Sequence, residues 1–218
     1  MNLNEIVLTA EEVRVIGALT EKELTTPEYY PLTLNSLVNA CNQKSNREPV
    51  VNYPDVIVEE IIDSLREKGL VRRVTGSDMR VPKYKQGFTE EYNFSPEETA
   101  VMCILMLRGA QTLGEIKVRT GRMYNFESLM QVEDVLRNLA NREKPLVTKL
   151  PKQTGMKESR YTHLLSGEPV IESVPAEEEV EISKNDERIE KLESEIETLR
   201  AELAELKEQF DKFKKQFE

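Results

Sequence analysis

The sequence predicts a mainly α-helical protein with small β-strands, an α+β fold, in which one order of elements occurs twice before a coiled-coil helix. Three observations lead to this prediction. Two segments open with the same helix-start signal, two later segments share a helical pattern followed by strand-rich runs, and residues 182–218 place apolar residues in a heptad repeat. At about 100–200 residues per domain, a chain of 218 residues has room for one or two domains.

The first helix of each copy is predicted from a capping box. Thr9 is followed three positions later by Glu12, and Ser95 by Glu98. In this motif the two side chains satisfy backbone amides that a helix start leaves without partners. Pro96 stands at the first helical position, where a missing N–H costs nothing. Both segments are therefore expected to begin helices.

The third helix and the strands of each copy are predicted from a second match. The run "VEEIIDSL" from Val58 shares three identical positions with "VEDVLRNL" from Val132, and three more are conservative. A shorter helical segment precedes each run, and two strand-like segments follow it. Three helices followed by a strand, a turn and a strand are the order of a winged helix. We therefore predict two tandem winged-helix domains, at residues 1–88 and 89–167.

A polar run, "NACNQKSNREPVVNYP" at residues 39–54, belongs partly to an insertion of the first copy. Matching Leu34 to Leu113 gives that copy twelve extra residues, seven around "TTPEYYP" and five within this run. One interpretation is structural: Asn39, Asn42 and Asn46 cap a helix or hold turns, and residues 47–48 pin the insertion to the body. The other is that its donors contact nucleic acid or a protein partner.

The C-terminal segment is predicted to be an acidic, Pro- and Glu-rich linker at residues 168–181 and then a coiled coil. Its apolar residues recur at spacings of three and four after a first gap of seven, with Asn185 at one polar core position. Ile and Leu at the two core positions favour a parallel dimer. A single amphipathic helix that folds back on the body is the alternative. The predicted coiled-coil core is Ile182, Ile189, Leu192, Ile196, Leu199, Leu203, Leu206, Phe210, Phe213 and Phe217.

Composition argues against several classes of protein. No apolar run approaches the ~20 residues of a membrane span, and the N-terminus lacks the pattern of a signal peptide, so a cytoplasmic protein is expected. Cys41 and Cys103 have no metal-ligand spacing, His163 is the one histidine, and no Gly-rich phosphate loop is present. Cys103, in "AVMCILML", is expected in the core. We predict no enzyme, no metal and no cofactor.

Charge points to the hairpins of the two copies. The net charge of −10 is concentrated in residues 168–218, which carry 8 basic and 17 acidic residues. The third helix of the first copy is acidic, which disfavours its entry into a DNA groove. Residues 69–88 and 144–163 each carry a net charge of +4. This charge could form a phosphate-binding surface. The alternative is two solvated hairpins whose Lys and Arg side chains protect the edge strands from pairing with other chains. The candidate nucleic-acid-binding residues are Lys44, Arg47, Arg72, Arg73, Arg80, Lys83, Lys85, Arg119, Arg122, Lys157 and Arg160.

Several motifs together resemble one bacterial family. The segments "TTPEYYPL", "ACNQKSNREPV", "LRGAQT", "GRMYNF" and "ESRYTHLLSG" are similar to those of the YceH-like family, over residues 8–167. The resemblance implies two tandem winged helices, a heptad tail and a cytoplasmic location. It implies no activity, because the molecular role of the family is uncharacterised.

These observations predict a non-enzymatic cytoplasmic regulator that binds DNA as a homodimer. Its basic wings would hold phosphates, with little readout of bases. The alternative is a protein-interaction scaffold, similar in architecture alone to the bacterial segregation-and-condensation protein B. The acidic third helices and the coiled coil would then be its binding surfaces.

Overall fold

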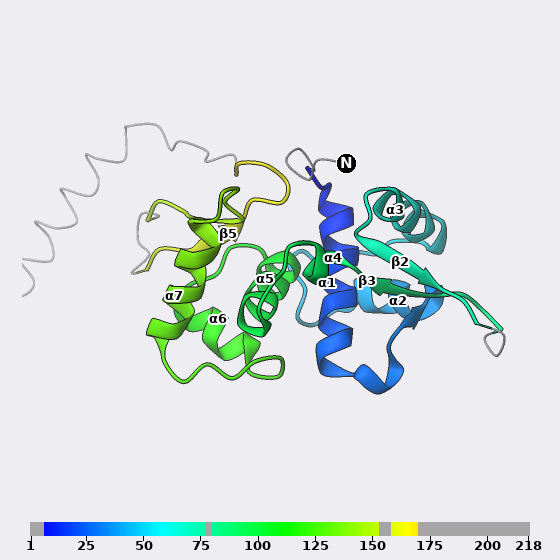
Figure 1. The fold of residues 1–218 in the computed structure, drawn as a ribbon, viewed down its shortest axis with the longest axis horizontal. Coiled ribbons are helices and arrows are strands. Elements are labelled where there is room, and N and C mark those ends of the chain that lie inside the picture. The colour runs from blue at the N-terminus through cyan, green and yellow to red at the C-terminus, as the bar shows by residue number, and fades with distance from the viewer. Residues whose placement is uncertain (1–6, 77–79, 153–157, 170–218) are drawn as a thin grey trace, which may run out of the picture. The chain divides into compact units, whose positions relative to one another are not determined.

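The computed structural model describes residues 7–76, 80–152 and 158–169, and within them the protein has an α+β fold (Figure 1). Helices are the main regular elements of this part of the chain, with one three-stranded and one two-stranded antiparallel sheet. The expected α+β class is confirmed. The predicted coiled coil at 182–218 and the linker residues 170–181 lie outside the described residues.

Two long helices, α1 (Ala10–Thr25) and α5 (Pro96–Arg108), begin where the capping boxes predict. At the start of α1 the amide of Glu12 donates to the hydroxyl of Thr9 over 3.2 Å, and the amide of Thr9 donates to the carboxylate of Glu12 over 2.9 Å. The same reciprocal pair of bonds forms at Ser95. Both helix starts are thus confirmed, because each satisfies two amides that would otherwise lack partners.

The remaining helices and the hairpin strands follow the predicted order in both halves. The first half contains α2 (Leu34–Cys41), α3 (Asp55–Glu67), β2 (Val71–Val74) and β3 (Lys83–Gln86). The second half contains α6 (Leu113–Thr120), α7 (Leu129–Ala140), β4 (Val147–Lys149) and β5 (Tyr161–His163). In each half the last two strands pair antiparallel and form a hairpin.

The two third helices bury the same stripe of residues. Along α3, Val58, Ile62 and Leu65 are buried, at the spacing that places side chains on one face of a helix. The equivalent buried residues of α7 are Val132, Leu136 and Leu139. The opposite face of each helix is exposed, so the similarity between the two sequence runs reflects similar packing.

Three short elements were not expected. The insertion "TTPEYYP" contains a 3-10 turn, η2 (Pro27–Tyr29), and is followed by β1 (Leu32–Thr33), which adds a third strand beside β3. The short helix α4 (Phe88–Glu91) connects the halves. In the second half a single bridge between Gln111 and Tyr161 stands in the place of β1. Segments of two to four residues are too short to show a helical or strand period.

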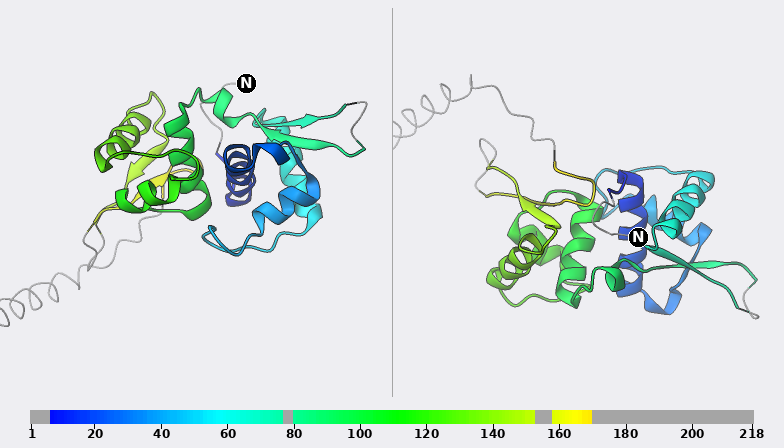
Figure 2. Two further views of the ribbon diagram at one scale, coloured as in Figure 1. Left: turned by 90° about the horizontal axis from the view of Figure 1, so that it is seen from below. Right: turned by 45° about the horizontal axis from the view of Figure 1, so that its top comes forward.

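The helices α1 and α5 pack against each other and join the two halves (Figure 2). Gly17 of α1 allows a close approach, because a Cβ there would lie 2.9 Å from a methyl carbon of Leu107. The thiol of Cys103 lies 3.6 Å from the carbonyl oxygen of Gly17 and is fully buried, which confirms its place in the core. Both helices are buried on most sides, and the cores of the two halves are continuous.

Candidate functional site

The β2–β3 hairpin extends outward from the helices of the first half (Figure 1) and carries five of the eleven predicted cations. Arg72 lies opposite Lys85 in the strand register, and Val74 lies opposite Lys83, so these side chains share one face of the hairpin. Arg72 forms an ion pair of 2.7 Å with Glu90, and both side chains are largely exposed. Such an exposed pair contributes little to stability and can be exchanged for another anion.

Four cations of this hairpin have no partner in the described part of the chain. Arg73 and Arg80 are exposed, Lys83 and Lys85 are half-buried, and none of their side chains forms a hydrogen bond or an ion pair with a described residue. Every described charged residue between the two strand ends, 71–76 and 80–86, is basic. The described part of the hairpin therefore presents positive charge that no other described residue neutralises, apart from the pair of Arg72 with Glu90.

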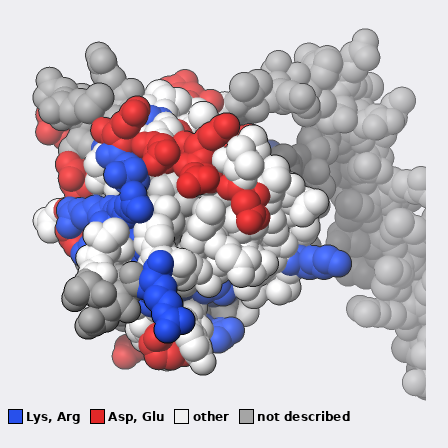
Figure 3. Space-filling view, turned by 90° about the vertical axis from the view of Figure 1, so that its right-hand side faces the viewer, with Lys and Arg blue, Asp and Glu red and all other residues white. Residues whose placement is uncertain are grey.

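The helix α3 presents the opposite charge on a neighbouring part of the surface. Its five carboxylates are all exposed, whereas Arg66 is paired with Asp63 at 2.8 Å and the following Lys68 with Glu12 at 2.6 Å. Figure 3 shows acidic side chains gathered across the top of this face, where α3 lies in Figure 1, and basic side chains mainly below them, some in contact with the acidic ones. Phosphates would be repelled by α3 and attracted by the hairpin.

The second hairpin is not equivalent to the first. Arg160 donates to a carboxylate oxygen of Glu115 over 2.9 Å and to the carbonyl oxygen of Ala110 over 2.8 Å. Burial alone would raise the pKa of Glu115, but the Thr112 amide, Arg160 and Arg119 lower it overall. Arg119 lies 3.3 Å from the same carboxylate. Arg119 and Arg160 thus hold the start of α6 against the second hairpin.

Arg47 is also engaged within the protein. Its side chain is fully buried and donates to the carboxylate of Glu21 over 2.6 Å and to the carbonyl oxygen of Ala40 over 2.9 Å. That carbonyl is in the last turn of α2, where helix carbonyls lack partners within the helix. Arg47 therefore closes the end of α2 and fastens it to α1, as the structural interpretation of the polar run predicts.

Other residues of the polar run have structural roles as well. The Asn42 amide exchanges two hydrogen bonds with the backbone of Tyr53, of 2.8 and 2.7 Å. Asn46 has a φ of 62°, in the left-handed region that asparagine tolerates, and its side chain accepts a hydrogen bond from Arg108. Asn39 is exposed on α2 and is not a cap. The contacts of Arg47 and Asn42 hold the run within the first half, and the bond of Asn46 to Arg108 ties it to α5.

The remaining predicted cations lie apart from these networks. Lys44 and Arg122 are exposed and form no hydrogen bond or ion pair within the described residues. Lys157 lies outside the described residues. The structure therefore divides the candidates into unpaired cations on the first hairpin, paired cations around Glu115 and Glu21, and a few isolated ones.

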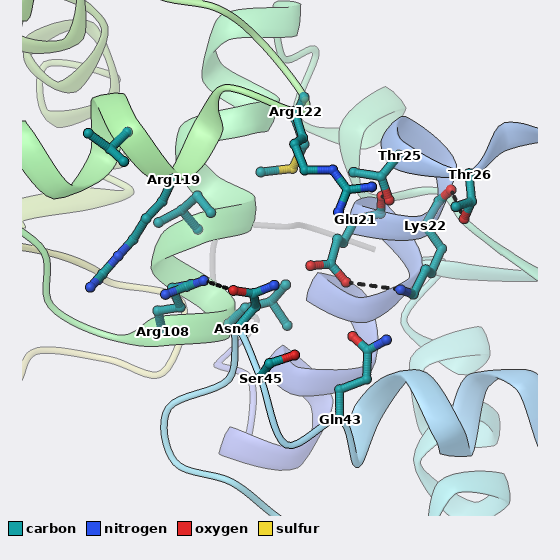
Figure 4. A pocket seen from close by; sticks show the side chains of 14 residues that line it. Glu21, Lys22, Thr25, Thr26, Gln43, Ser45, Asn46, Arg108, Arg119 and Arg122 are labelled. Carbon is teal, nitrogen blue, oxygen red and sulfur yellow. Dashed lines mark hydrogen bonds and ion pairs between the residues drawn. The ribbon is translucent and has the colours of Figure 1, made fainter.

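A pocket of about 460 Å³ opens where α1, α5, α6 and the polar run meet (Figure 4). It brings Arg119 and Arg122 together with Lys22 and Arg108, which were not predicted. The sequence held a signal for the latter two. When Thr9 is matched to Ser95, Lys22 falls on Arg108, so each first helix carries a cation in its last turn.

The two cysteines are buried and the one histidine, His163, is half-buried. Burial raises the pKa of the Cys41 thiol to about 12, raises that of Cys103 still further, and lowers the pKa of His163 to about 4. Over the described ranges, no cluster of three His, Cys, Asp or Glu side chains is suited to hold a metal ion. Within those same ranges no helix has both the length and the apolarity to cross a membrane.

Comparison with known proteins places similar chains in one group. The family model described as "Protein of unknown function, DUF480" matches residues 8–156. A UPF0502 protein of Solibacter usitatus is 54% identical over 171 residues, which are 78% of this chain and 82% of the relative. A UPF0502 protein of Opitutus terrae is 53% identical over 174 residues, 79% and 76% of the two chains. One of Vibrio campbellii is 48% identical over 190 residues, 85% and 88% of the two chains.

Proposed function

This chain belongs to the DUF480 family, which the YceH-like resemblance also fits, and we propose that it binds DNA by holding phosphates on the β2–β3 hairpin of its first half. The observation that carries this proposal is the set of four cations, Arg73, Arg80, Lys83 and Lys85, that have no partner in the described chain. The exposed Arg72, whose pair with Glu90 is easily exchanged, would be a fifth contact.

We propose that the two halves, residues 1–88 and 89–167, are winged-helix domains and that residues 182–218 form the dimerising coiled coil. The repeated order of three helices and a hairpin supports the first part of this proposal. The heptad pattern supports the second. A dimer would present two basic hairpins to one duplex and gain affinity through a high effective concentration of the second site.

The proposed contact is electrostatic and largely independent of sequence. The acidic α3 would stay out of the DNA groove, because the phosphates that line the groove repel its five exposed carboxylates. Four phosphate contacts would give a slope of log K against log salt of roughly −3 to −4 for each chain, at about 0.9 per contact. Phosphate contacts position a protein on DNA and do not read bases, so duplexes of different sequence should bind alike.

The test is fluorescence anisotropy of a labelled random duplex, titrated with the full-length protein at several salt concentrations. The variant Arg73→Gln/Arg80→Gln removes two exposed guanidinium groups from the hairpin, and its salt slope should fall by about 2 for each chain. The matched control is Arg66→Gln/Arg137→Gln, which removes two exposed arginines from α3 and α7 and the same charge. Binding that does not depend on salt, or equal losses in both variants, would refute the proposal.

A scaffold that binds another protein is the second candidate function. Val56 of α3 and Met130 of α7 stand at equivalent positions of the repeat and are 64% and 71% exposed. An exposed apolar residue repeated among acidic neighbours suits a protein contact. Recovery of a partner after nuclease treatment, and its loss with Val56→Ser/Met130→Ser, would favour this function over DNA binding.

A further inference from the structure

The pocket between the two halves has four cationic residues in its lining. It is lined by Lys22 at the end of α1, Arg108 at the end of α5, Arg119 of α6, and Arg122 just after α6 (Figure 4). Glu21 is the one carboxylate in the described lining, and it already accepts a bond of 2.6 Å from Arg47. Four positive groups and one negative group leave the lining with a net charge of +3.

Two of these cations are already paired, Lys22 with Glu21 at 3.6 Å and Arg119 with Glu115 at 3.3 Å, and the other two leave charge without a counterpart within the described chain. The Nε atom of Arg108 is buried and has no hydrogen-bond acceptor, although the other end of its guanidinium group donates to Asn46. Arg122 forms no hydrogen bond or ion pair with a described residue. Burial and the neighbouring Arg119 lower the pKa of Arg108. Like charges that crowd in a partly desolvated site are unfavourable unless an anion joins them.

The remaining lining selects among anions. Hydroxyl and amide groups of Thr25, Gln43 and Ser45 add hydrogen-bonding partners, and Ile104 and Leu107 supply apolar surface. The volume of about 460 Å³ lies within the range of about 300–1,000 Å³ that is usual for sites of small molecules. Guanidinium groups match the oxygens of a phosphate with two parallel hydrogen bonds. A group that is both phosphorylated and partly apolar fits these features together.

We propose that this pocket binds a small phosphorylated molecule, one that joins a phosphate or diphosphate to an apolar or aromatic part, as nucleotides do. No described residue of the β2–β3 hairpin lines the pocket, so the site is separate from the proposed DNA contact. Lys22 comes from the first half and the three arginines from the second. A bound phosphate therefore links the two halves and stabilises their present arrangement.

The test uses the full-length protein without DNA, and the probes are ADP, inorganic pyrophosphate and adenosine. Calorimetric titration at constant ionic strength should detect ADP and pyrophosphate, and ADP should raise the unfolding temperature in proportion to log concentration. Adenosine should bind at least tenfold more weakly than ADP, because it lacks the charge that the arginines neutralise. If ADP and pyrophosphate do not bind, the proposal is wrong.

Variants assign the binding to this pocket. Arg122→Gln removes an exposed side chain that no described residue needs, so the fold should persist, and ADP affinity should fall roughly tenfold for the loss of a charged hydrogen bond. The matched control is Arg137→Gln, an exposed arginine of α7 outside the pocket, which should leave ADP affinity within about twofold. Equal affinity of Arg122→Gln and the unchanged protein would place ADP elsewhere and overturn the assignment.

Competition separates a small ligand from a DNA backbone. A duplex added at a concentration that saturates the hairpin should leave ADP affinity unchanged, because the two sites share no residue. Displacement of ADP by the duplex would mean that these cations serve DNA phosphates, and it would overturn the proposal for a small ligand. Failure of the duplex to bind at all would count against the proposed function alone.

Discussion

The buried pair of Arg47 and Glu21 allows a quantitative prediction. Arg47 has no exposed side-chain surface, Glu21 is 14% exposed, and the two groups are 2.6 Å apart. The variant Arg47→Leu replaces the guanidinium group with an apolar side chain and leaves the Glu21 carboxylate and the Ala40 carbonyl without this donor. Removing one partner of a buried pair costs about 3–5 kcal/mol, because the other charge stays buried. Among the described residues, Glu21 keeps only Lys22, at a longer distance of 3.6 Å. We expect a loss of that size from Arg47→Leu.

Urea unfolding of the full-length protein at pH 7 measures this loss. The matched control is Arg66→Leu, which breaks an exposed pair with Asp63 of similar length, 2.8 Å. That change should cost about 0–1 kcal/mol, because solvent screens exposed pairs. If both variants lose the same free energy of unfolding, the inference that Arg47 holds the end of α2 is wrong.

The pH dependence of the same variant gives a second readout. Burial alone would raise the pKa of Glu21, but Arg47 and, to a lesser extent, Lys22 lower it below its ordinary value of 4.5. A lowered pKa in the folded state means stabilisation that is present above pH 4.5 and is lost as the pH falls through the folded-state pKa. In Arg47→Leu, burial would instead raise the pKa of Glu21. The difference in stability between the two proteins should therefore shrink from pH 7 to pH 4, and a constant difference would contradict the reasoning.

Three further substitutions test contacts of α1 and of the polar run. Gly17→Ala should destabilise the protein by about 1–3 kcal/mol, because α5 must shift to accept a Cβ. A Cβ at Gly114 would meet nothing closer than 4.0 Å, so Gly114→Ala should not destabilise the protein, and thermal unfolding of the two variants compares them. Asn46→Ala should lower the free energy of unfolding in urea by about 1–2 kcal/mol more than Asn46→Gly does. Both variants lose the hydrogen bond with Arg108, but a φ of 62° is strained for alanine and not for glycine. Glu12→Gln should cost about 1–3 kcal/mol at pH 7, because it weakens the 2.6 Å contact with Lys68; a loss no larger at pH 7 than at pH 3 would argue against this charge effect.

The sequence was informative where structure depends on residues close together in the chain. The capping boxes at Thr9 and Ser95 join residues three positions apart, and the buried stripe of α3 repeats within one helix. Both patterns can be read from a short window. The short strand β1 and the helix α4 could not, because each is defined by what packs against it and not by a period of its own.

The candidate site was predicted less well, because counting charges along a segment does not show which cations are already paired. Arg47 meets Glu21 across 26 positions, and Arg160 meets Glu115 across 45. Neither contact follows from local spacing. The pocket was missed for the same reason, since Lys22, Arg108 and Arg122 come from three separate segments. In the sequence, only the match between the two first helices places Lys22 and Arg108 at equivalent positions.

The difference between the two hairpins bears on how the protein could combine two roles. Glu115 lies beside the second hairpin, and it draws Arg160 and Arg119 inward to the start of α6. The first hairpin has Glu90 as its described acidic neighbour, which pairs with Arg72 and leaves the other described cations of the hairpin without partners among the described residues. Most of the predicted unpaired cations of the first half therefore lie on its hairpin, whereas three arginines of the second half, Arg108, Arg119 and Arg122, line the pocket. Because the two sets do not overlap, Arg73→Gln/Arg80→Gln should retain ADP binding and Arg122→Gln should retain DNA binding. Loss of both activities in either variant would indicate a damaged fold and not a damaged site.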